Sequence, residues 1–168
     1  MNDRQSPVRT LVSAADGRVI PLGELYDTRY AKGAQGDGFA VLPPAGVQRL
    51  RLSAENAARA LIDGAGRAGL YAPADGVVTA LDPRGRLTLR TCDAVEVCVV
   101  YGAGAHIFTG LGERLSSAQQ FGVLGGEMRA EGCAALVIFP HTERITELQI
   151  KAGARRGGQQ AATYRAVF

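Results

Sequence analysis

The sequence predicts an all-β domain, an antiparallel β-sandwich or barrel built from two similar halves. Three observations lead to this prediction: a short motif occurs twice, one segment alternates between polar and apolar residues, and glycines are dense in the third quarter of the chain. A chain of 168 residues with 46% hydrophobic residues suits one domain, which can bury a core without disulfide or metal support. We therefore expect residues 1–168 to form a single domain.

The repeated motif is Ala-Asp-Gly followed by a short apolar stretch, and it stands at 15–19 and again at 74–78. Asp-Gly favours a turn, because the aspartate can accept a backbone hydrogen bond and glycine tolerates positive φ. Each copy is thus predicted to begin a strand, and two such units indicate a duplicated strand motif.

The other elements follow from periodicity. Residues 86–90 alternate as a half-buried strand does, residues 95–101 are rich in β-branched side chains, and the turn between them predicts a hairpin over 86–101. Further strands are expected at 38–42, 77–81, 136–139 and 163–168. One inserted helix is expected from Ser53 to Gly64, with Ser53 as N-cap and an apolar face formed by Ala57, Ala58, Leu61 and Ile62.

Cysteines, charge and hydropathy exclude several classes of protein. Cys92, Cys98 and Cys133 form neither an even disulfide framework nor a Cys-x-x-Cys pair. The net charge of +3 rests mainly on scattered arginines, so nucleic-acid binding is not expected, although Arg155 and Arg156 are adjacent. No apolar run of about 18 residues and no apolar signal core occur, so no membrane span is expected and the expected location is the cytoplasm. No cofactor-binding motif is found.

Five segments, in order, resemble the glucose-type IIA domain of the bacterial sugar phosphotransferase system. They are 12–22, 36–43, 72–78, 94–97 and 126–132. The resemblance covers residues 10–140, apart from an inserted segment at about 44–69, and the tail at about 141–168 diverges from the family pattern. It implies an antiparallel sandwich with two related strand motifs, as the residues themselves predict.

The resemblance also implies a pair of active-site histidines, one of which carries phosphate, and neither is present here. The carrier position matches Val100 and the second position matches Gly85. Neither valine nor glycine can accept a phosphoryl group or bind zinc, so we expect no histidine phosphorylation, no metal and no cofactor. His106 is the alternative nucleophile, whereas His141 is expected in a loop. Cys98 lies two residues from Val100 on the same strand face and is the remaining nucleophile to consider.

Two functions therefore remain open. The first is a binding or regulatory domain, a pseudo-phosphotransferase whose former active face contacts an unidentified protein partner. The residues that match this face are Phe39, Val41, Leu81, Gly85, Cys98 and Val100. The alternative is a phosphocarrier in sugar uptake with His106 as a relocated nucleophile. Whether the inserted helix covers the former active face is left open by the sequence.

Overall fold

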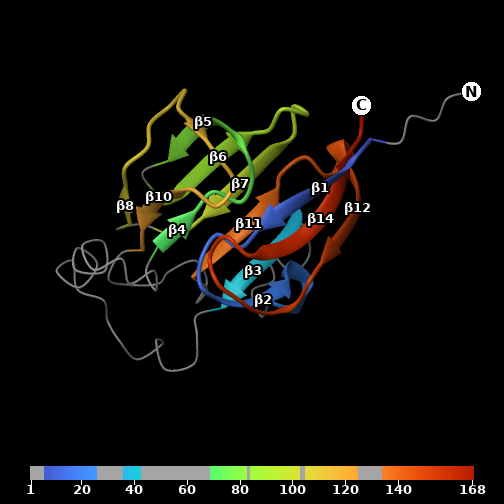
Figure 1. Cartoon of the computed structure of the whole chain (residues 1–168), viewed down its shortest axis with the longest axis horizontal. Coiled ribbons are helices and arrows are strands. Elements are labelled where there is room, and N and C mark those ends of the chain that lie inside the picture. The colour runs from blue at the N-terminus through green and yellow to red at the C-terminus, as the bar shows by residue number, and fades with distance from the viewer. Residues whose placement is uncertain (1–5, 26–35, 43–68, 83, 103–104, 125–133) are drawn as a thin grey trace, which may run out of the picture.

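The computed structural model describes residues 6–25, 36–42, 69–82, 84–102, 105–124 and 134–168. These residues form three antiparallel sheets and two short 3-10 turns, Leu22–Glu24 and Thr142–Arg144 (Figure 1). The predicted all-β sandwich is confirmed. In the described ranges no helix is long and apolar enough to cross a membrane. The predicted helix at 53–64 lies outside the described residues.

The largest sheet has eight strands in the order β13-β2-β3-β11-β7-β6-β5-β9. Its strands are β2 (Gly17–Pro21), β3 (Asp37–Leu42), β5 (Gly76–Asp82), β6 (Arg86–Arg90), β7 (Glu96–Val100), β9 (Arg114–Leu115), β11 (Ala135–Phe139) and β13 (Gly153–Arg155). The predicted hairpin over 86–101 is present as β6 and β7, and the predicted strands at 38–42, 77–81 and 136–139 are β3, β5 and β11.

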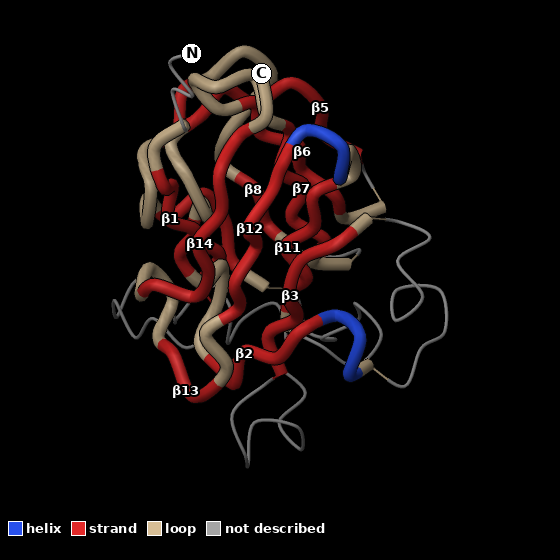
Figure 2. The backbone as a smooth tube through the Cα atoms, turned by 90° about the vertical axis from the view of Figure 1, so that its right-hand side faces the viewer, coloured by secondary structure: helices blue, strands red, loops and turns tan. Residues whose placement is uncertain are grey.

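Two three-stranded sheets complete the sandwich, one in the order β1-β14-β12 and one in the order β4-β10-β8. Their strands are β1 (Val8–Val12), β4 (Gly69–Tyr71), β8 (His106–Ile107), β10 (Gln120–Val123), β12 (Ile145–Ile150) and β14 (Gln160–Ala166). β14 takes the place of the strand predicted at 163–168. Figure 2 shows β1, β14 and β12 side by side in front of β2, β3 and β11.

One apolar core joins the three sheets. It contains side chains of the large sheet such as Phe39, Val99 and Val137, together with Tyr164 from β14 and Phe121 from β10. We call the face of the eight-stranded sheet that contributes to this core the inner face, and the opposite face the outer face. Burial of this core is the main favourable term in folding.

The order of the strands shows that the whole fold is duplicated. The sequence β13-β2-β3-β11 at one end of the large sheet is repeated as β9-β5-β6-β7 at the other end, and the two copies meet at the β11–β7 pair. The sheet β1-β14-β12 corresponds in the same way to β4-β10-β8. One half is therefore continuous, from β4 to β10, whereas the other half combines both ends of the chain (Figure 1).

The two Ala-Asp-Gly motifs occupy equivalent places in these halves. The carboxylate of Asp16 accepts a hydrogen bond from the backbone N–H of Gly157 at 2.7 Å, and that of Asp75 accepts one from Ser117 at 2.6 Å. The duplicated motif predicted from the sequence is therefore confirmed, and each aspartate connects the start of a strand to a distant turn.

The two turns that bind these aspartates, at 156–159 and 116–119, also have the same hydrogen bonds. The side-chain carbonyl of Gln159 accepts a hydrogen bond from the N–H of Arg156 at 2.8 Å, and that of Gln119 accepts one from Ser116 at 2.9 Å. Each turn also closes with a backbone bond of 3.0 Å between the same two positions. The tail beyond residue 140 thus supplies β12, β13 and β14 to the duplicated sheets.

The glycines of the motifs serve a different purpose from the one expected. A Cβ on Gly17 would overlap the carbonyl of Leu42, and a Cβ on Gly76 would lie 2.8 Å from the carbonyl oxygen of Arg90. At both positions glycine is needed because the backbone of a neighbouring strand approaches too closely for a Cβ. Gly76 does not have a positive φ. The expectation that both glycines provide positive φ is wrong for Gly76.

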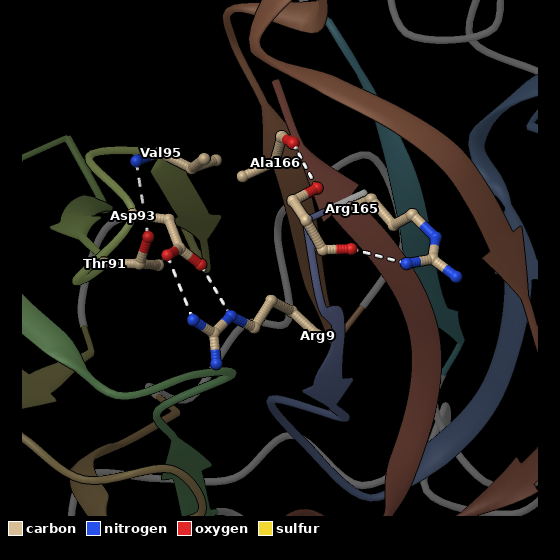
Figure 3. A network of polar contacts seen from close by, with 7 residues as sticks. Arg9, Thr91, Asp93, Val95, Arg165 and Ala166 are labelled. Carbon is tan, nitrogen blue, oxygen red and sulfur yellow. Dashed lines mark hydrogen bonds and ion pairs between the residues drawn. The ribbon is translucent and has the colours of Figure 1, made fainter. Parts of the chain in front are cut away.

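An ion pair connects β1 to the other half of the fold. Arg9 on β1 forms a bidentate ion pair with Asp93, with Nε to Oδ2 at 2.6 Å and Nη2 to Oδ1 at 3.0 Å (Figure 3). Asp93 lies in the turn between β6 and β7, where Thr91 accepts a hydrogen bond from the N–H of Val95. The ion pair therefore links strands from different halves of the fold.

Candidate functional site

The candidate site is the outer face of the large sheet around Val100. Opposite residues on antiparallel neighbours place their side chains on the same face of a sheet. Arg86 pairs with Val100, Val100 with Leu136, Leu136 with Ala40, and Ala40 with Ile20. These five side chains form one row across the outer face, which Asp82 on β5 continues beside Arg86, so the charged residues of the row lie at its β5–β6 end.

The apolar part of this face is a small second core. Buried side chains on it are Ile20, Leu22, Ala40, Leu136 and Ile138, and partly buried ones are Leu25, Leu42 and Val100. The sequence left open whether this face is exposed or covered, and on its described part the apolar side chains are buried or partly buried. Within the described ranges, the exposed large apolar side chains lie elsewhere and are Val8, Phe108, Leu111, Val167 and Phe168.

The position that matches the carrier histidine has no nucleophile. Val100 is half-buried at the end of β7, and its hydrocarbon side chain packs against the second core. Its cross-strand neighbour on β6 is Arg86, whose guanidinium offers hydrogen-bond donors and no acceptor and therefore cannot act as a nucleophile. The chemistry available at this point of the sheet is apolar contact and hydrogen-bond donation.

The position that matches the second histidine cannot hold a side chain in this backbone. Gly85 has a φ of 103°, and a Cβ added to it would overlap the backbone of Gly102. The carbonyl of Gly85 accepts hydrogen bonds from Tyr101 at 2.9 Å and from Gly102 at 3.2 Å, which keep the β5–β6 turn against the end of β7. The absence of histidine at 85 is therefore built into the packing of this turn.

Cys98 lies on the outer face of β7 between Glu96 and Val100 and carries the thiol of this face. The residue is 1% exposed, and its thiol accepts a hydrogen bond from Nη2 of Arg86 at 3.1 Å. The Oγ1 of Thr88 lies 3.3 Å from the same sulfur. Sequence reasoning singled out Cys98 but missed Arg86 and Thr88, although the period of two across 86–90 places both of them on one face.

The six residues predicted to form one partner-binding face do not share a face. Phe39 and Val41 are fully buried on the inner face, and Leu81 packs against the same core. Cys98 and Val100 point to the outer face, and Gly85 lies in a turn. The prediction selected residues by their match to a family pattern, whereas strand alternation separates them.

A β-bulge explains why Leu81 belongs to the inner face. The register between β5 and β6 shifts between Val78 and Ala80, so Val78 pairs with Leu89 and Leu81 pairs with Leu87. An extra residue in one strand reverses the alternation beyond it. Without this shift the inner positions would be Ala80 and Asp82.

His106 lies in a different part of the sandwich from Val100. It begins β8, pairs with Val123, and is exposed. The next residue, Ile107, packs against the core on the inner side of the large sheet. His106 therefore does not replace a histidine beside Val100, because the sheet itself separates the two positions.

His141 interacts with two carboxylates at the surface. Its Nε2 lies 3.1 Å from Oε2 of Glu96, and its Nδ1 lies 3.6 Å from Oε1 of Glu143. The residue is exposed and follows β11, as the expected loop position requires. Among the described residues, no group of three or more histidine, cysteine, aspartate or glutamate side chains could hold a metal ion.

Comparison with known proteins defines the class of this fold. No family model matches the chain, and no curated protein matches it in sequence. The fold is that of a glucose-type IIA domain. The structure is similar to that of glucose permease IIA from Mycoplasma capricolum, with a TM-score of 0.70 over 94% of this chain and 96% of that chain. At 18% sequence identity this similarity establishes the shared fold.

Proposed function

We propose that this chain is a IIA-like binding or regulatory domain that does not carry phosphate on histidine. The observation that supports the proposal best is the contact between Gly85 and Gly102, because it closes one of the two matching positions to any side chain. Val100 occupies the other position with a hydrocarbon. A partner protein and a cytoplasmic location are part of this proposal.

The outer face supports binding better than chemistry. It combines a half-buried Val100 with a guanidinium that already donates to a neighbouring side chain, the thiol of Cys98. Arginine is enriched in protein interfaces and among their anchor residues. Phosphoryl transfer would require a nucleophile at this place.

Intact mass spectrometry tests the proposal directly. The chain is incubated with phosphoenolpyruvate and the general proteins of the sugar phosphotransferase system, and an active glucose-type IIA domain serves as the control. We expect no mass gain in this chain while the control gains one phosphoryl group. A stoichiometric gain in this chain would overturn the proposal.

Two variants identify the nucleophile if a gain is seen. Loss of the gain in His106→Ala would establish the alternative, a phosphocarrier in sugar uptake with a relocated histidine. Loss of the gain in Cys98→Ser would assign the phosphoryl group to the thiol. Both side chains are within the described residues, and His106 is exposed whereas Cys98 is buried.

A further inference from the structure

We draw no further inference here: the strongest candidate, the side-chain cluster of Cys98, Arg86 and Thr88 on the outer face of β6 and β7, belongs to the candidate site already described and rests on a single buried cysteine, with no second feature among the described residues that points to a ligand.

Discussion

Gly85 and Gly102 pack backbone against backbone, at a separation that leaves no room for a Cβ on Gly85. The contact lies where the turn between β5 and β6 meets the end of β7. It leaves no room for a side chain at a position that matches an active-site histidine in the family that the chain resembles. The first prediction concerns this contact.

Gly85→Ala should lower the free energy of unfolding by about 1–3 kcal/mol, since it combines a positive φ with a steric overlap. Gly112→Ala is the matched control for φ alone, because Gly112 has a φ of 80° and nothing within 4 Å of an added Cβ. Urea unfolding measures both. A smaller loss in Gly85→Ala than in Gly112→Ala would contradict the role of the contact.

Asp16→Ala and Asp75→Ala should destabilise the protein by similar amounts, about 1–2 kcal/mol each, because each leaves one backbone N–H of a distant turn without its acceptor. Thermal or urea unfolding of the two single variants provides the comparison. Strongly unequal losses would show that the two halves are not energetically equivalent despite their matching geometry.

Alkaline pH should destabilise the fold through Tyr164. Burial raises the pKa of its hydroxyl, against a smaller lowering by its hydrogen bond with Thr91. The stability that this neutral tyrosine contributes is fully present below about pH 10, the pKa of an unfolded tyrosine, and is lost as pH rises through the higher pKa of the folded state.

In Tyr164→Phe the loss of stability per pH unit above pH 10 should be smaller by up to about 1.4 kcal/mol. Urea unfolding at a series of alkaline pH values measures the slope. Burial also raises the pKa of Tyr101, so Tyr101→Phe should act in the same direction. An unchanged slope in Tyr164→Phe would mean that this hydroxyl does not titrate differently in the two states.

The ion pair between Arg9 and Asp93 should contribute a coupling free energy near the upper end of the usual surface range, about 1 kcal/mol, because it is bidentate and Asp93 is mostly buried. A double-mutant cycle with Arg9→Ala and Asp93→Ala measures the coupling. Added salt should reduce it, since Arg9 remains partly exposed. Zero coupling at low salt would show that the ion pair forms in the folded protein without contributing to its stability.

Much of the fold could be predicted from the sequence. The Asp-Gly motifs at 16–17 and 75–76 each begin a strand, as local turn chemistry predicts, and the alternation at 86–90 gives the hairpin of β6 and β7. What the sequence pattern did not reveal was the partner of each aspartate. Gln119 and Gln159 close two equivalent turns, but a lone glutamine three residues into a turn carries little signal without a structure.

The candidate site was predicted less well. Val100 and Gly85, which were matched to the family histidines, lie at the end of β7 and in its adjoining turn, whereas Phe39 and Leu81 belong to the opposite face. Strand alternation groups Phe39 with Val41 and Cys98 with Val100, but only the register of β11 with β3 and β7 shows that the two pairs lie on opposite faces. Leu81 could not have been assigned from its sequence, because the bulge that turns it inward depends on how β5 pairs with β6.

The unequal way in which the chain builds its two halves has a consequence for how it folds. The half from β4 to β10 consists of neighbouring strands and can form from a continuous piece of chain. The other half must bring Ser6 on one end to Ala166 on the other, 160 positions away. Closing so large a loop is slow, because its entropy is lost before the contacts are gained. During synthesis on the ribosome, β2 and β3 can pair with each other, whereas β1 pairs with β14 and gains this partner only after β14 has been made.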